Sequence, residues 1–198
     1  MISWIFIGLV MTILLTPGPT NTLLASSGVQ VGVRKSLKLI PAEAMGYFIA
    51  IGAWGMLIGF ISKTLPLLPV IIKLASATYI VFLAIKLWKT AKQDLNMDQP
   101  TIGARELFCA TLLNPKALLF ASAIFPASAW TSLKLYMMHI LTFEALIMPI
   151  ALCWILLGTV LTSNKVQWLN ACNLQRTASL VLMTFSVPMS YSAILSLQ

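Results

Sequence analysis

The segment from Met1 to Val33 contains no Lys, Arg, Asp or Glu, yet residues 16–21 in its interior read Thr-Pro-Gly-Pro-Thr-Asn. An apolar run of this length is typical of a membrane span. Each proline removes a backbone donor and clashes with the preceding turn, so the helix must break. In hydrocarbon, the freed carbonyl groups need partners from protein, ion, water or substrate. We interpret the motif as a broken helix that lines a site; the alternative is a proline kink that only shapes the helix.

The composition of the chain is that of a membrane protein. Of its 198 residues, 59% are hydrophobic and 9% are charged, and the mean hydropathy is +0.92. A soluble domain carries about 25% charged residues. The net charge of +8 does not indicate nucleic-acid binding, because the basic residues lie at the ends of apolar segments. No Lys or Arg precedes the first apolar run, so we expect no cleaved signal peptide.

Six apolar segments divide the chain, and each is near the ~20 residues that a helix needs to cross the hydrocarbon core. They run over about 2–25, 39–61, 65–88, 107–130, 135–161 and 177–195. The predicted fold class is therefore all-α: a polytopic membrane protein with six transmembrane helices.

The basic residues other than Lys116 are unevenly divided between the two sides. The first, third and fifth connections hold Arg34, Lys35, Lys38, Lys86, Lys89, Lys92, Arg105, Lys165 and Arg176. The opposite side holds Lys63, Lys73 and Lys134, and Lys116 is set aside as intramembrane. Because cytoplasmic loops carry the excess of Lys and Arg, the odd connections are predicted to be cytoplasmic. An even number of spans then places both termini in the periplasm.

The chain is expected to form one membrane domain, 1–198, made of two related halves. The first half covers about 1–89, a cytoplasmic loop covers about 90–106, and the second half covers about 107–198. Similar residues recur at offsets of 98 to 101 positions: Pro17 and Pro115, Glu43 and Glu144, Trp54 and Trp154, Gly59 and Gly158. With three spans each, the halves must enter the membrane from opposite sides. This predicts an inverted repeat, a common plan for secondary transporters.

A second break is predicted at Asn114-Pro115-Lys116, inside an apolar run. Asn followed by Pro is a helix-start signal, with Asn as N-cap and Pro as the first helical residue. Gly18-Pro19 reads the same way. A helix N-terminus carries roughly half a positive charge, and two such ends near the midplane would suit a substrate carboxylate. Lys116 would add a full charge there, unless its side chain extends to the cytoplasmic interface.

Glu43 and Glu144 are the acids inside the apolar segments. A charge at the bilayer centre costs at least ~2.5–3.5 kcal/mol, so such residues usually face the bundle interior and carry function. Glu43 follows Pro41 and is close to Lys38 in sequence, which leaves interfacial pairing open. Glu144 lies further from Lys134 and is expected to be internal. Either acid could bind a substrate ammonium group or a coupling proton.

The chain carries no pattern typical of a metal, cofactor or nucleotide site. Cys109, Cys153 and Cys172 have neither disulfide nor metal spacing, and His139, the one histidine, is expected at an interfacial helix end. No Walker A pattern is present. We therefore expect no cofactor, no metal and no enzymatic activity.

Two alternatives to a transporter deserve a test. A membrane thiol-redox relay needs two cysteines that can meet within the bundle, and the first half has none. A channel or a structural subunit of a larger complex is the other alternative. A purely structural role leaves two helix breaks and two intramembrane acids unexplained.

With these residues in view, the chain resembles the LysE/RhtB family of bacterial amino-acid exporters over nearly its whole length. The strongest part is the motif at 16–21, followed by Gly28 and Gly32. The stretch 114–120, Asn-Pro-Lys-Ala-Leu-Leu-Phe, looks like the second family signature. Tyr79 lies where the family often has Gly-Ala-x-Tyr, although Ser76 stands in place of the glycine.

The resemblance implies six helices, a homodimer, and gradient-driven export of amino acids or their derivatives across the bacterial inner membrane. Glu144 looks like an acid that some members carry in the fifth span. The residues predicted to contact the substrate are Pro17, Gly18, Pro19, Asn21, Asn114, Pro115 and Lys116. Glu144 and Glu43 are predicted to bind the ammonium group or the coupling proton.

Overall fold

The structure is a computed structural model that describes residues 2–61, 67–90 and 102–162, together with scattered positions between 176 and 187. Every regular element in this described part is helical. Most of the sixth predicted span and of the predicted cytoplasmic loop lies outside the described residues, as do Lys63 and Cys172.

The first predicted span is a pair of helices, α1 (Trp4–Leu15) and α2 (Pro19–Ser36), bent by 57° at the break between them. Gly18 is the N-cap of α2 and Pro19 opens the helix, where its missing N–H costs no hydrogen bond. Helix α2 continues well past residue 25, the predicted end of the span. It bends again at Gly32, whose φ of 78° lies in the left-handed region that glycine tolerates.

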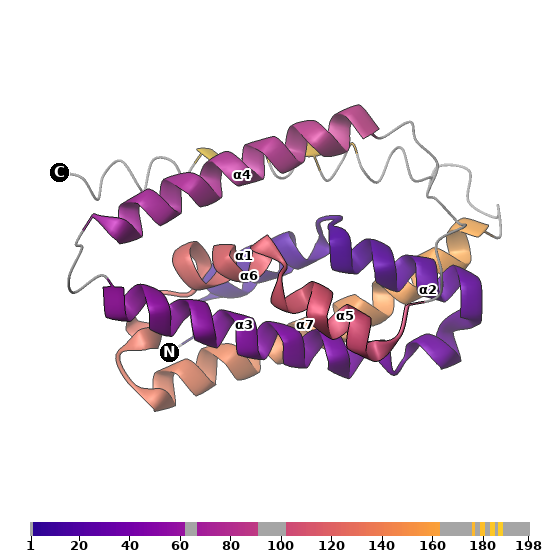
Figure 1. Cartoon of the computed structure of the whole chain (residues 1–198), viewed down its shortest axis with the longest axis horizontal. Coiled ribbons are helices and arrows are strands. Elements are labelled where there is room, and N and C mark those ends of the chain that lie inside the picture. Colours follow the sequence, from indigo (N-terminus) through magenta and orange to yellow (C-terminus); the bar gives the residue numbers. More distant parts are fainter. Residues whose placement is uncertain are drawn as a thin grey trace.

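Two unbroken helices follow. Helix α3 (Leu39–Ile61) has the same bounds as the second predicted segment, and α4 (Leu68–Thr90) covers most of the third. In the view of Figure 1, α4 runs along one edge of the molecule, and α1 and α6 lie between it and α3.

The second half begins with another bent pair. Helix α5 (Ala104–Leu112) is followed by α6 (Pro115–Leu119), which runs into the π-helical turn η1 (Phe120–Ile124); the bend at the break is 44°. The 3₁₀ turn η2 (Ala127–Trp130) then leads into the long helix α7 (Leu133–Thr162).

Glycines bring the backbones of α2 and α7 into direct contact. A Cβ atom on Gly28 would lie 2.1 Å from the Ile155 carbonyl oxygen, and one on Gly158 would lie 2.0 Å from that of Ala25. Without side chains at these two positions, the helices pack at backbone distance, as small residues allow in membranes. Gly46 on α3 similarly accommodates Thr111 of α5. These crossings join each half of the chain to the other.

The described helices confirm the predicted all-α polytopic membrane fold. Helices α3 and α7 are each long and apolar enough to cross a membrane, over Leu39–Phe60 and Leu133–Val160. The two bent pairs pass the same test when each is taken as one span, which gives up to four spans among the described residues. The count of six and the inverted relation of the halves stay predictions.

Candidate functional site at the paired helix breaks

The first break leaves the last carbonyl groups of α1 without helical partners. Pro17 has no N–H to give to the Ile13 carbonyl, and the chain leaves the helix at Thr16, whose backbone is extended. The Thr16 N–H reaches the Ile13 oxygen at 3.2 Å, so this carbonyl keeps one partial helical bond. The carbonyls of Leu14 and Thr16 need donors from elsewhere.

Asn21, in the first turn of α2, supplies part of that need. Its Nδ2 donates to the Leu14 oxygen and to the Thr16 oxygen, both at 2.8 Å. Trp154 Nε1 of α7 also donates to the Leu14 oxygen, at 3.4 Å. Asn21 is therefore a clamp across the break: it holds the end of α1 to the start of α2.

Lys116 supplies the rest, from the other half of the chain. Its Nζ donates to the Ile13 oxygen at 3.0 Å and to the Thr16 oxygen at 2.6 Å. The residue is 3% exposed. This placement excludes the alternative in which the lysine extends to the cytoplasmic interface. Gly18 makes room for it, since a Cβ there would lie 2.9 Å from both Cε and Nζ.

Asn114 binds the second break to the first. Its Oδ1 accepts from the Lys116 backbone N–H at 3.0 Å, which is the predicted N-cap of α6. Its Nδ2 donates to Thr20 Oγ1 at 3.3 Å and to the Tyr47 hydroxyl at 2.9 Å. One amide thus joins α2, α3 and α6, and these three partners are buried.

Glu43 lies in this cluster rather than at an interface. It is 1% exposed, lies beside Thr20, and its carboxyl group interacts electrostatically with Lys116. Tyr47, one helical turn further along α3, is also beside Thr20. The cluster therefore contains a basic group, an acidic group, side-chain amides and backbone carbonyls in a place with almost no solvent contact.

Glu144 is on α7 and is half-buried. Its Oε1 is buried and has no hydrogen-bond partner in the described part of the chain. The carboxyl group interacts electrostatically with Glu43 and with Tyr136. The two acids of the predicted coupling site are therefore close enough to affect each other, although only Glu43 is next to the breaks.

Sequence reasoning missed three members of the cluster. Thr20 was seen only as part of the motif, Tyr47 was not singled out, and Trp154 was noted only as half of a repeated pair. The helical spacing of Tyr47 from Glu43, one turn along the same face, was the available signal. His139, expected at an interfacial helix end, lies near the start of α7 and is buried, with its ring centroid 5.1 Å from that of Phe6.

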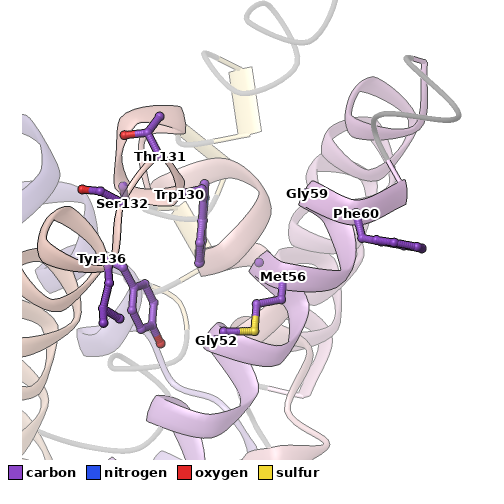
Figure 2. Close-up of a pocket in the computed structure, with 11 residues that line it drawn as sticks. Gly52, Met56, Gly59, Phe60, Trp130, Thr131, Ser132 and Tyr136 are labelled. Atoms are coloured by element: carbon purple, nitrogen blue, oxygen red, sulfur yellow. The ribbon is translucent and has the colours of Figure 1, made fainter.

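An open groove of about 570 Å³ lies further along α3, near its C-terminal end. Its lining combines a glycine face of α3 with the turn that precedes α7: Gly52, Gly55, Met56, Gly59, Phe60, Ala129, Trp130, Thr131, Ser132, Leu133 and Tyr136. Figure 2 shows the rings of Trp130 and Tyr136 facing the groove, whereas Phe60 points away from them.

Aromatic rings continue from this groove toward the breaks. Trp130 stacks on Tyr136 and on Phe125, with centroids 5.4 and 5.7 Å apart. Phe125 in turn contacts Phe143, whose ring lies against Tyr47 of the buried cluster. The groove and the polar cluster are thus separated by packed rings.

The two cysteines that the structure describes, Cys109 and Cys153, are free and exposed. Their thiols are therefore not part of the polar cluster at the breaks.

Comparison with known proteins gives one match. The family model of the LysE type translocators matches residues 11–193, a range that includes both breaks and both acids. No curated protein and no solved structure matches the chain. Because the match covers most of the chain, this protein belongs to the LysE type translocator family of membrane transporters.

Proposed function

We propose that this transporter is a secondary active exporter of amino acids or their derivatives across the bacterial inner membrane, driven by a proton or ion gradient. The observation that carries the proposal is the buried cluster in which Lys116 of the second break donates to the Thr16 carbonyl of the first and Asn114 donates to Thr20. Buried ionisable groups in a membrane are costly and usually mark a transport pathway.

The cluster offers complementary partners for both ends of a zwitterion. Lys116 and the side-chain amides of Asn21 and Asn114 would bind a carboxylate, because they carry N–H donors and a positive charge. Glu43 and, further along the bundle, Glu144 would bind the ammonium group or a coupling proton. A site between two broken helices also suits alternating access, since each half can move against the other around it.

The groove beside α3 would provide the outward exit. The distribution of Lys and Arg assigns the end of α3 and the start of α7 to the periplasmic side. Substrate released from the cluster would pass the rings of Phe125, Trp130 and Tyr136 to reach the groove. The expected homodimer belongs to the same proposal, and cross-linking in native membranes tests it.

An efflux assay tests the proposal directly. The protein is expressed in a bacterial strain that lacks its own amino-acid exporters, and the cells are loaded with a panel of amino acids through dipeptides. We expect uncoupler-sensitive release of one or a few amino acids. A chain that is present in the membrane but releases none of them would contradict an amino-acid exporter.

The matched inactive variant is Pro17→Ala combined with Gly18→Leu. The first change restores a backbone N–H, so the helix can continue through the break. The second places a large side chain at position 18, where even a Cβ atom would lie 2.9 Å from Lys116 Cε and Nζ. We expect export to fall to background while membrane insertion is unchanged, as measured by immunoblotting of the membrane fraction. Wild-type export from the inserted double variant would show that the site is elsewhere.

Replacing Cys109, Cys153 and Cys172 together with serine separates export from the thiol-redox alternative. An exporter is expected to keep its activity, because the described thiols, Cys109 and Cys153, are outside the cluster. A strict loss of activity in the cysteine-free chain would favour the relay instead.

A further inference from the structure

The carbonyl groups at the end of α1 already hold an amino group. Lys116 Nζ lies 3.0 Å from the Ile13 oxygen and 2.6 Å from the Thr16 oxygen, in an environment that excludes solvent. The lysine belongs to α6, in the other half of the chain. The Lys116 ammonium group therefore occupies the first break as a bound ligand would, although its aliphatic side chain links it covalently to α6.

Three features make this position suitable for a cation. The C-terminal end of a helix carries a partial negative charge, of about half an elementary charge. Pro17 removes the N–H that would otherwise bond the Ile13 carbonyl, so this oxygen can accept from an outside donor. The carboxyl group of Glu43 adds an electrostatic interaction with Lys116. The oxygens thus attract a group with a positive charge and several N–H donors.

The site is also shaped for a slim cation. Gly18 contributes no side chain, and a Cβ at that position would lie 2.9 Å from Lys116 Cε and Nζ. A primary ammonium group, with three hydrogens on its nitrogen, is narrow enough to fit beside a bare Cα. A quaternary ammonium group has no N–H to donate and is too wide for this space.

We propose that the Ile13 and Thr16 carbonyls form a binding site for a primary ammonium group, which Lys116 fills when no substrate is bound. The ammonium group of the substrate then takes its place during transport. This second step rests on the proposed function. Once displaced, Lys116 pairs with the substrate carboxylate, so one exchange satisfies both ends of the zwitterion. The buried carbonyls have a donor before and after it.

The exchange would determine the substrate specificity of the site. A substrate must carry a primary ammonium group close to a carboxylate. The ammonium group replaces Lys116 at the two carbonyl oxygens, and the carboxylate then accepts a hydrogen bond from the displaced Lys116. An amino acid trimethylated at its nitrogen keeps its charge but has no N–H groups, so it should not be exported. The same comparison distinguishes a carbonyl site from a simple negative patch.

Chemical rescue tests the ammonium site without any transport. Lys116→Ala removes three carbons and the nitrogen, which is the outline of n-propylammonium. The purified full-length variant is heated in detergent with increasing n-propylammonium, with ionic strength kept constant by choline chloride. We expect a saturable rise of several degrees in the unfolding midpoint, because the amine binds only the folded chain. The wild-type protein, whose site is filled, should show no such rise.

Two probes of the same length define what is recognised. We expect n-propanol, which is neutral, and n-propyltrimethylammonium, which has no N–H, to stabilise Lys116→Ala much less. Equal stabilisation by all three probes, or an equal response of variant and wild type, would overturn the ammonium site.

Lys116→Met decides the matter if the alanine variant is not recovered in folded form. Methionine fills the space of the lysine stem but brings no N–H donor to the carbonyls. A lower unfolding midpoint than that of the wild type, with no rise in n-propylammonium, supports the proposal. A Met variant as stable as the wild type would show that packing alone is required there, and would overturn it.

Failure of this inference can be told apart from failure of the proposed function. Rescue by n-propylammonium without efflux of any amino acid would leave the ammonium site standing and remove the exporter proposal. Efflux without rescue, or equal export of a substrate and its trimethylated form, would leave the exporter standing and remove the exchange.

Discussion

Tyr47 shows how one hydroxyl can hold the two halves of this transporter together. Its ring is fully buried and makes edge contacts with Phe120 and Phe143, with centroids 5.9 and 5.6 Å apart. Its hydroxyl accepts the Asn114 Nδ2 donor at 2.9 Å. The ring therefore anchors α3 in the core, and the hydroxyl fixes the amide that caps α6.

Tyr47→Phe should lower stability while the ring contacts stay in place. Asn114 Nδ2 would keep only its longer bond to Thr20, and an unsatisfied buried donor costs about 1–3 kcal/mol. We expect the unfolding midpoint in detergent to fall by a few degrees at a fixed heating rate. Tyr136→Phe is the control, since its hydroxyl makes a longer bond of 3.4 Å to the Phe48 carbonyl in a half-buried place. An equal fall in both variants would contradict the role given to Tyr47.

The site residues could be predicted from the sequence only as far as local chemistry reaches. The prolines and glycine at 17–19 predict a helix break, and Asn114 before Pro115 predicts an N-cap. Both predictions succeed because helix breaking and capping depend on residues only a few positions apart. Some of the donors that bind the freed carbonyl groups come from residues far away in the sequence. Lys116 reaches Thr16 across 100 positions, and Trp154 reaches Leu14 across 140. No spacing within one helix encodes such a contact.

At the scale of whole elements, the paired glycines of α2 and α7 set how the halves meet. Gly28 lies against the Ile155 backbone, and Gly158 lies against that of Ala25. Each helix thus presents a glycine to the backbone of the other. Because lipid offers no hydrophobic drive between helices, close packing of this kind has to hold them together.

Gly28→Ala should separate these helices. The new methyl group would meet the Ile155 carbonyl oxygen at 2.1 Å, and overpacking of this kind costs about 1–3 kcal/mol. Gly8→Ala is the matched control, because a Cβ on Gly8 of α1 meets no atom within 4 Å. There the helix propensity of alanine gains about 0.5–1 kcal/mol instead. We expect opposite shifts of the unfolding midpoint, and a fall in both would contradict the crossing.

The same region explains why one helix was predicted well and its neighbour was not. Helix α3 has the predicted bounds because its apolar run begins directly after Lys38. Helix α2 continues to Ser36, although the apolar segment was expected to end near residue 25. The Ser27 and Ser36 hydroxyls bond to each other at 2.8 Å, which satisfies them inside the fold. This bond spans the bend at Gly32 within α2, and Gly28 packs the same stretch against the Ile155 backbone of α7. The helix therefore continues past residue 25 where it is in tertiary contact with α7.

At the scale of the whole molecule, the polar cluster and the groove would be two separate parts of the proposed transport path. The cluster lies where the two breaks meet, and the groove lies near the end of α3. Packed rings of Phe125, Trp130, Tyr136 and Phe143 stand between them. In the proposed exporter, these rings would separate the exit from the site in a closed state, as alternating access requires.

Orientation in the membrane gives the last prediction, because the exit must face outward if the protein is an exporter. In a chain without its three cysteines, we introduce Ser132→Cys at the groove and Lys35→Cys in the last turn of α2. The excess of basic residues assigns the Lys35 side to the cytoplasm. A membrane-impermeant maleimide added to intact cells should label the cysteine at 132 and should label the one at 35 only after permeabilisation. Labelling in the reverse order would invert the orientation, and the groove would then be the entrance for the substrate.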